Sequence, residues 1–451
     1  MQGRLELGSV ASNGLVGLTF GDINNFTLSY TNVPNFGDLS FTKGSIATTD
    51  GDRNGSIQIF AKNILVSEGS QIYATTNGAG IGNDISIRAT GDINIIGQSA
   101  FTGSNLSGIF TIESSTATGK GGNVSIEAQN LRVTNGAQIG SLTFGNGNAG
   151  NLNLRVADTI EVRGLSPDNT NFSGLVANAS AGFSGNAGNI SIDTGNLLIS
   201  NGAQVTAYKF NTGNDLGRAG SIDVAANQIS VRGESNDGQL ASILGTFGIN
   251  GNLNLTAQTL NILDGGRIQA SGNGSRLTSR THDLSVIGTS SDGRGSSTFG
   301  TSGIDSTVNI DTQNLSILNG AVLRTGVGQP VGIDALDIKA DRIEVAGRSP
   351  VSYINDSGEL TNLNSQIFTP TFSDANAGSI KIDTRTLSIR DSGDINANTF
   401  TDARGGDINI RARDSIEITG RIGVSPSEIV SQSGNKSGTN YWHRSGERKR
   451  R

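Results

Sequence analysis

A phrase of about twenty residues recurs along this chain, and no other feature restricts the possible folds as strongly. It has the form G-N-I-x-I-x-A-x-x-L-x-V-x-x-G-A-x-I-x-A, as in GNVSIEAQNLRVTNGAQIGS and GNISIDTGNLLISNGAQVTA. Six clear copies begin their first strand at Ile57, Val124, Ile190, Leu253, Val308 and Ile380. The differences between successive positions are 67, 66, 63, 55 and 72. The chain therefore has a super-repeat of about 65 residues.

A second variant of the phrase lies between these copies and matches only its first half. Examples are GNLNLRVADTIEVRG and GDINIRARDSIEITG. After this half, the third strand is displaced by an insertion, such as GLSPDNTN before SGLVANAS. Because the two variants alternate, we expect two coils per super-repeat and a loop at the same corner of every second coil.

Within each copy the side chains alternate with a period of two, which is typical of strands. Val124, Ile126 and Ala128 point one way, while Ser125 and Glu127 point the other. The short strands end at Gly, Asn or Asp, residues that tolerate the left-handed backbone of a tight corner. A hairpin meander fits poorly, because identical phrases stack equivalent residues only when the coils lie in parallel register.

The sequence therefore predicts an all-β fold, a right-handed parallel β-helix with coils of roughly 20 residues and three strands per coil. A sandwich or a propeller is the alternative. Equivalent aliphatic side chains are expected to form ladders inside a column without a cleft. A charge in place of Ile192 or Ile382 is expected to break this stack locally.

Composition excludes several classes of function. The 451 residues include 64 Gly and no Cys, which excludes disulfide scaffolds, thiol catalysis and Cys-based zinc sites. The net charge of -6 is scattered, whereas a nucleic-acid partner requires a basic stripe. We divide the chain into the start of the β-helix at residues 1–54, a shaft at 55–439 and a basic irregular tail at 440–451.

Residues able to perform catalysis do not gather in the sequence. The two histidines, His282 and His443, are far apart, and aromatic residues make up only 5% of the chain. Four aspartates recur directly after a core position and are expected to face solvent: Asp193, Asp223, Asp311 and Asp383. We therefore expect no catalytic residue, no cofactor and no enzymatic activity.

One segment reproduces the opening of a calcium-binding loop. Asp50, Asp52 and Asn54 stand at its first, third and fifth places, and Gly55 stands at the sixth. The twelfth place, where such loops carry a bidentate glutamate, is Ala61. A polar corner before the next strand is the favoured interpretation, and Asp50, Asp52 and Asn54 are kept as candidate calcium ligands.

The phrases NVSIEAQNLRVTNGAQIGS and NISIDTGNLLISNGAQVTA, with the intervening IEVRG, resemble the shaft repeats of cyanobacterial filamentous haemagglutinin-like exoproteins. The opening GRLELGSVASNGLVGLTF resembles the segment that closes the haemagglutination domain of those proteins. The resemblance extends to about Thr439. It implies two-partner secretion through an outer-membrane transporter, folding outside the cell, and adhesion or aggregation at the cell surface.

The expected function is therefore a structural and adhesive shaft of a secreted surface protein. Its partners would be surface glycans or other cells, reached through loops 166–173 and 349–364. The N-terminal MQGRLELGSV lacks the apolar stretch of a signal peptide, so either the protein stays inside the cell or this chain is a piece of a longer one, whereas the resemblance implies secretion to the outer cell surface. A carbohydrate-active β-helix enzyme or lectin, and a non-functional gene fragment, are the alternatives.

Overall fold

The computed structural model describes residues 3–20, 26–52, 55–99, 105–210, 217–326, 334–355, 358–371, 376–399 and 402–433. The described residues form strands, turns and loops and contain no helix, which confirms the all-β prediction. The chain divides into two compact units, Met1–Asn227 (unit 1) and Gln228–Arg451 (unit 2). The sequence analysis did not predict this division, which falls within β18 (Ile222–Arg232).

Unit 1 consists of two parallel sheets. Its first sheet contains β1 (Arg4–Gly8), β4 (Leu39–Phe41), β6 (Ser56–Ala61), β7 (Ile64–Ser67), β9 (Asp84–Ala89), β10 (Asp92–Ile96), β12 (Val124–Thr134), β14 (Leu152–Arg163) and β16 (Ile190–Ser200). Its second sheet contains β5 (Ile46–Gly51), β8 (Gln71–Thr76), β11 (Gly108–Glu113), β13 (Gln138–Thr143), β15 (Gly174–Ala179) and β17 (Gln204–Lys209). An antiparallel hairpin, β2 (Leu15–Phe20) and β3 (Phe26–Asn32), follows β1 in the chain.

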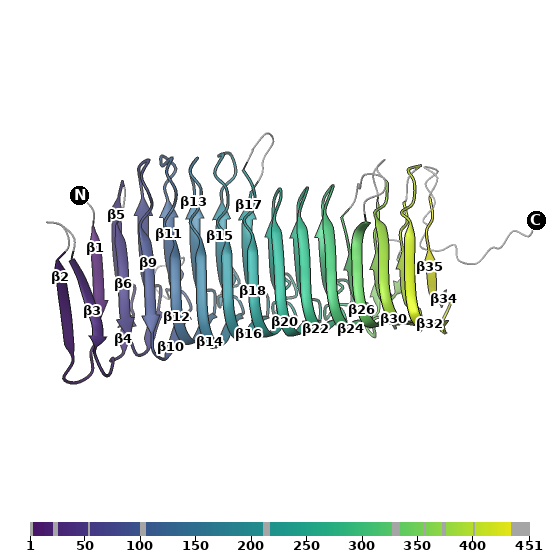
Figure 1. Cartoon of the computed structure of the whole chain (residues 1–451), viewed down its shortest axis with the longest axis horizontal. Coiled ribbons are helices and arrows are strands. Elements are labelled where there is room, and N and C mark those ends of the chain that lie inside the picture. Colours follow the sequence, from purple (N-terminus) through teal and green to yellow (C-terminus); the bar gives the residue numbers. More distant parts are fainter. Residues whose placement is uncertain are drawn as a thin grey trace, which may run out of the picture. The chain divides into compact units, whose positions relative to one another are not determined.

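Unit 2 repeats this plan (Figure 1). Its first sheet contains β20 (Asn252–Leu263), β22 (Arg276–Ile287), β24 (Thr307–Leu318), β26 (Asp334–Ala346), β30 (Ser379–Arg390) and β32 (Ile408–Thr419). Its second sheet contains β19 (Ile243–Phe247), β21 (Arg267–Ser271), β23 (Thr298–Ser302), β25 (Val322–Arg324), β29 (Gln366–Phe368), β31 (Asp394–Asn396) and β35 (Glu428–Val430). Two short hairpins lie in its loops: β27 (Tyr353–Ile354) with β28 (Leu360–Thr361), and β33 (Arg421–Ile422) with β34 (Ser425–Pro426).

Successive phrases stack in parallel register, with Val124 beside Leu152 and Leu152 beside Ile190. This pairing confirms the parallel β-helix and excludes a meander of hairpins for these copies. One coil therefore runs from Val124 to Leu152, and the next, which carries a loop, runs from Leu152 to Ile190. The expected coil length is wrong, and both coils are longer than the repeated phrase, because the phrase covers the strands and omits the corners and loops between them.

The expectation of three separate strands per coil holds for the coil of β6, β7 and β8 and for the coil of β9, β10 and β11, and it needs correction from β12 onward. In β12 the buried positions are Val124, Ile126 and Ala128, followed by Leu131 and Val133. The spacing changes where the register shifts between Ala128 and Asn130, so the strand bends there without ending. β14 has its own irregularity beside this bend, between Val156 and Thr159. The backbone pairing of the two strands therefore continues both before and after the bend.

Aliphatic ladders fill the interior as predicted. Leu131, Ile160 and Leu197 lie beside one another in three coils, and each is fully buried. Ile192 and Ile382 are also buried. Full burial of such a side chain stabilises the fold by roughly 1.5 to 3 kcal/mol, so the core depends on many similar small contributions.

Asparagines hold the corners that precede the first sheet. Asn151 N–H donates to Asn123 Oδ1 at 2.9 Å, Asn189 N–H donates to Asn151 Oδ1 at 3.1 Å, and Ser221 N–H donates to Asn189 Oδ1 at 2.8 Å. At the opposite corner, Asn135 has a φ of 57°, so asparagine adopts the left-handed backbone that the turn requires. These asparagines therefore bind the next coil or form a turn.

Two long polar side chains are enclosed in unit 1 at the ends of second-sheet strands. Lys209 is 1% exposed, and its Nζ donates to the carbonyls of Ser180 and Phe183 at 2.7 and 2.6 Å. Glu113 is fully buried, and neither of its carboxyl oxygens has a hydrogen-bond partner among the described residues. Burial raises the pKa of Glu113 to about 7, although the nearby Thr143 hydroxyl lowers it in part.

Glu113 should make unit 1 less stable as the pH rises. The unfolded chain releases this proton near pH 4.5, whereas the folded chain keeps it until about pH 7. The stabilisation is therefore complete below pH 4.5 and is lost as the pH rises through 7. We expect Glu113→Gln to raise the urea midpoint at pH 8 and to change it little at pH 4.5. Asp193→Asn, at an exposed position, is the control, and an equal effect of Glu113→Gln at both pH values would contradict this account.

Candidate functional site

Every second coil carries a loop between the two sheets, and each loop is closed by a glycine and a serine. The serine N–H donates to the glycine carbonyl at 2.9 to 3.2 Å. Each glycine has a φ between 71° and 81°, which allows the chain to leave the sheet abruptly. The closing pairs are Gly97 with Ser107, Gly164 with Ser173, Gly233 with Ser242, Gly288 with Ser297, Gly347 with Ser365 and Gly420 with Ser427.

The hydroxyl of the same serine joins the loop base to the preceding coil. Ser297 Oγ donates to the Ile287 carbonyl at 2.7 Å and accepts the Gly265 N–H at 2.9 Å. Ser173 and Ser365 make the equivalent pair of bonds. We call this arrangement the serine clamp. Sequence reasoning missed it, although a Gly after the half phrase and a Ser directly before the next strand would have indicated it.

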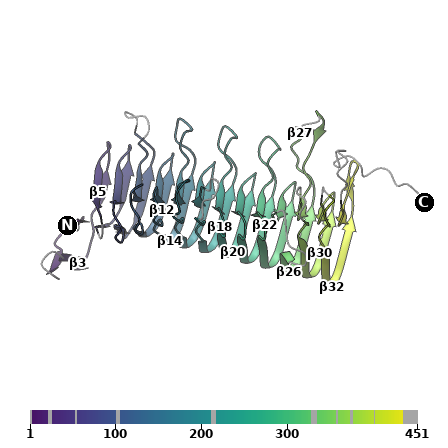
Figure 2. The ribbon, with the colours of Figure 1, turned by 90° about the horizontal axis from the view of Figure 1, so that it is seen from above.

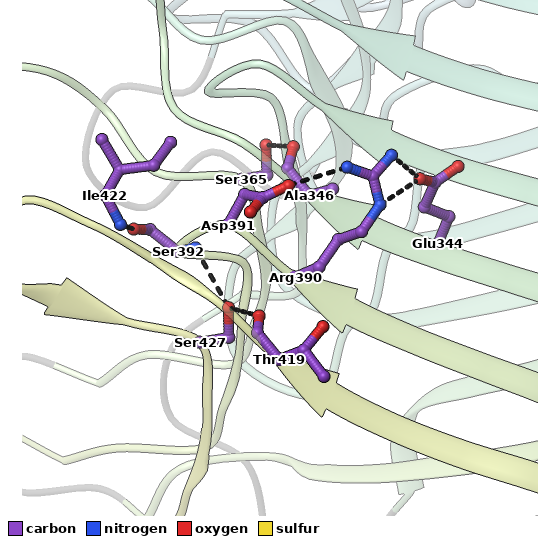
Figure 3. A network of polar contacts seen from close by, with 9 residues as sticks. All are labelled: Glu344, Ala346, Ser365, Arg390, Asp391, Ser392, Thr419, Ile422 and Ser427. Atoms are coloured by element: carbon purple, nitrogen blue, oxygen red, sulfur yellow. Dashed lines mark hydrogen bonds and ion pairs between the residues drawn. The ribbon is translucent and has the colours of Figure 1, made fainter.

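Figure 3 shows the last described serine clamp, together with the corner that it holds. Ser427 Oγ donates to the Thr419 carbonyl at 2.8 Å and accepts the Ser392 N–H at 3.0 Å. Beside it, Arg390 binds the carboxylates of Glu344 and Asp391. Backbone and charged side chains of three coils are therefore fixed at one corner.

The loop tips share a second feature, a serine that donates to an aspartate two residues later. The pairs are Ser166 with Asp168, Ser235 with Asp237 and Ser290 with Asp292. These serine hydrogen bonds hold the pKa of all three aspartates below its usual range. The next largest cause is the Gln98 side chain of the neighbouring loop for Asp168, and a backbone N–H of the same loop for Asp237 and Asp292. Each tip therefore presents an ionised carboxylate to solvent.

Neighbouring loops touch within each unit. In unit 1, Asn171 Nδ2 donates to Gln98 Oε1 at 3.3 Å. In unit 2, Ser291 N–H donates to Glu234 Oε1 at 2.9 Å, and the Thr289 and Ser349 hydroxyls lie 2.8 Å apart.

We call these contacting loops the loop ridge. Its described residues are 97–99, 105–107 and 164–173 in unit 1, and 233–242, 288–297, 347–355 and 358–365 in unit 2. Figure 2 shows the loops of unit 2 rising from one side of the coils. The predicted contact surfaces, residues 166–173 and 349–364, belong to this ridge, and residues 356–357 lie outside the described part.

Unit 2 also contains an open groove of about 900 Å³ along the bends of its first sheet. Short side chains at the bends, such as Thr281 and Ala340, leave this space. The expectation of a column without a cleft is therefore wrong at this surface. Five charged side chains follow the groove, one in each successive coil: Arg280, Asp311, Lys339, Asp383 and Arg411.

Unit 1 has a groove of about 690 Å³ at the equivalent bends. Its charged side chains also alternate from coil to coil: Arg88, Glu127, Arg155 and Asp193. Glu127 lies 3.6 Å from Arg88 and 3.8 Å from Arg155, so opposite charges pair across coils here. We call these two rows the charge ladders.

The four aspartates expected to face solvent do point outward. Asp193, Asp223 and Asp311 are exposed, and Asp383 is half-buried. Sequence reasoning did not recognise that three of them stand in charge ladders. The signal was present as charges of opposite sign at the same place in successive phrases.

His282 lines the unit 2 groove and is paired with its neighbour in the chain. Its Nδ1 lies 2.9 Å from Asp283 Oδ2, and Asp283 Oδ1 accepts a hydrogen bond from Asn314 Nδ2 at 2.7 Å. These bonds, that of Asn314 foremost, lower the pKa of Asp283. His443 lies outside the described residues, so the separation of the two histidines stays a prediction.

The candidate calcium ligands are only partly described. Asp50 Oδ1 accepts a hydrogen bond from Thr48 Oγ1 at 3.0 Å, Asp52 begins a bend, and Asn54 lies outside the described residues. Within the described part of the chain, no three His, Asp or Glu side chains form a group able to hold a metal ion. Calcium binding by Asp50, Asp52 and Asn54 stays a prediction.

No family model, curated protein or solved structure matches this chain. The described residues also include no helix of the length and hydrophobicity needed to cross a membrane. The evidence for function is therefore the geometry of the loop ridge and the two grooves.

Ser297→Ala should loosen one loop without unfolding unit 2. It removes the bond to Ile287 and leaves the buried Gly265 N–H without its acceptor, at a cost of roughly 1 to 3 kcal/mol. We expect faster amide hydrogen exchange in loop 288–297 and unchanged exchange in β30. Ser296→Ala, at the neighbouring position, is the control. Equal exchange in both variants would show that the clamp does not hold the loop.

Proposed function

We propose that this chain is a structural and adhesive shaft of a secreted bacterial surface protein. The observation that supports this most directly is the serine clamp, which recurs beneath loops of different sequence. The hydrogen bonds at the base of each loop are the same while the loop sequence varies. The residues that support a loop are therefore different from the residues that can contact a partner. The parallel coils are the support, and the loop ridge is the surface that meets a partner.

The contacts between loops favour binding by many weak interactions. Loops on alternate coils stand about 9.6 Å apart, twice the spacing of about 4.8 Å between hydrogen-bonded strands. A partner with repeated groups, such as a surface glycan or another cell, then meets several loops at once. Such contacts add through avidity, which strengthens binding without any strong single site. Secretion through a two-partner outer-membrane transporter belongs to the same proposal and is supported by the resemblance of the repeats.

Changing the tips of two loops should weaken adhesion while the fold is kept. In the test variant, residues 235–240 and 291–295 become Gly and Ser, and the closing residues Gly233, Ser242, Gly288 and Ser297 remain. We expect at least roughly tenfold weaker retention of protein-coated beads on bacterial cells or glycan surfaces. Lys339→Gln, in the groove, is the control and should bind normally. Equal retention of the loop variant, or no retention of the wild type, would refute the proposal.

The unit 2 groove supports a second candidate, a carbohydrate-active enzyme or lectin. It brings Arg280, His282 and Asp311 to one open surface, which provides hydrogen-bond donors and acceptors for a sugar chain and, in His282, a candidate general acid or base. The groove lining contains no Phe, Trp or Tyr among the described residues, a feature that weakens sugar stacking. The shaft is therefore the preferred proposal.

Incubation with a panel of polysaccharides separates these two candidates. The shaft proposal predicts no release of reducing or unsaturated ends. An enzyme in the groove predicts release that falls at least roughly 100-fold in His282→Gln, the size expected for loss of a general acid or base. Asp223→Asn, exposed in unit 1, is the matched control. Release that is unchanged in His282→Gln would place any activity outside this residue.

A further inference from the structure

The last first-sheet strand of unit 2 has one free edge within the described residues. β32 pairs with β30 from Ile408 beside Ile380 to Thr419 beside Arg390, and no described strand pairs with its other side. Ile416 and Ile418 are 49% and 45% exposed, whereas Leu387 and Ile389, their counterparts in β30, are at most 1% exposed. A twelve-residue edge with half-exposed core positions is a template for pairing with another strand.

The first strand of unit 1 is protected, in contrast. The hairpin of β2 and β3 lies against it, and Leu28 N–H donates to the side chain of Glu6 at 3.2 Å. The Tyr30 ring packs on Phe60 with centroids 4.4 Å apart. A second copy therefore does not find an equally open β1, and the partner edge best suited to β32 is another β32.

We propose that two copies of this chain associate through antiparallel pairing of their β32 strands. The register follows from the shape of the strand, which bends between Ala412 and Ser415. The two bends superpose, with inward positions facing each other, when the twofold axis passes through Arg413 or Asp414. We take the register with Asp414 on the axis, because it also pairs opposite charges. Ile410 then lies opposite Ile418 of the second copy, and Ala412 lies opposite Ile416, so inward side chains meet inward side chains.

The same register gives charge complementarity on the outer face. Arg411 and Glu417 lie at equal distances along the strand on either side of Asp414. Arg411 therefore lies opposite Glu417 of the second copy, and the twofold axis repeats this pair. Both side chains are exposed, and neither forms an ion pair with any described residue. Opposite charges at facing positions of antiparallel strands stabilise the pair. The charge of Asp414 on the axis is neutralised by Arg385 of its own chain, whose guanidinium nitrogen lies 2.9 Å from Asp414 Oδ2.

This inference does not depend on the adhesive function. Residues 434–451, or a following coil of a longer chain, are the other possible occupants of the edge. A following coil would pair in parallel, which places Arg411 and Glu417 beside other residues. The two charges therefore distinguish self-association from these alternatives.

Light scattering after size-exclusion chromatography of the full chain is the test. We expect twice the chain mass of 46.5 kDa for the wild type. Arg411→Glu and Glu417→Arg should each give the single-chain mass, because each places two pairs of like charges together. The double variant, Arg411→Glu with Glu417→Arg, should return to twice the mass.

Arg276→Glu reverses an exposed charge on an inner strand of the same unit and should remain dimeric. A wild type with the single-chain mass at every concentration would overturn the proposal. Dimeric single variants would do the same, and so would a double variant that stays at the single-chain mass. Because the double variant must recover association, general loss of folding does not imitate the expected pattern.

Discussion

The structure depends on parallel stacking of equivalent residues, coil over coil, at a spacing of about 4.8 Å. This constraint places equivalent side chains of successive coils directly beside one another. Whether that contact stabilises the fold depends on the chemistry of the side chains. Aliphatic residues gain from it, and Leu131, Ile160 and Leu197 form a buried ladder. Like charges would repel at this distance, so the outer positions alternate in sign, as from Lys339 to Asp383. One rule therefore produces both the core and the charge ladders.

The same rule decides where the chain tolerates insertions. A residue added within one arm of a strand would shift every later side chain to the opposite face, whereas a residue added at a corner, or at the bend as in β14, shifts none. The loops accordingly lie between the sheets, and the serine clamp returns the chain to register after insertions of different lengths. Gly347 and Ser365 enclose a much longer loop than Gly288 and Ser297 do, with the same hydrogen bond at the base.

The sequence was sufficient for the fold because its signal is local and repeated. Alternation around Ile192 predicted an inward side chain, and the half phrases predicted loops on alternate coils. The contacts that could not be predicted from the sequence are those between residues of different coils. Ser297 binds Gly265 of the preceding coil, and Lys339 lies beside Asp383 of the following one. Coils of unequal length hide these partners until the register is known. The bend in β12 was missed because its backbone pairing continues through it.

The enclosed corners show which polar groups this architecture accepts. Turn carbonyls point into them, so a buried donor finds acceptors there, and Lys209 is satisfied by two carbonyl oxygens. At the corner of Glu113 the nearby donor is the Thr143 hydroxyl, which donates to the Gly147 carbonyl, and both oxygens of Glu113 have no hydrogen-bond partner among the described residues. Glu113 is therefore suited to this corner as a neutral acid, which can donate its proton to a carbonyl. The stacked backbone thus selects protonation state as well as side-chain type.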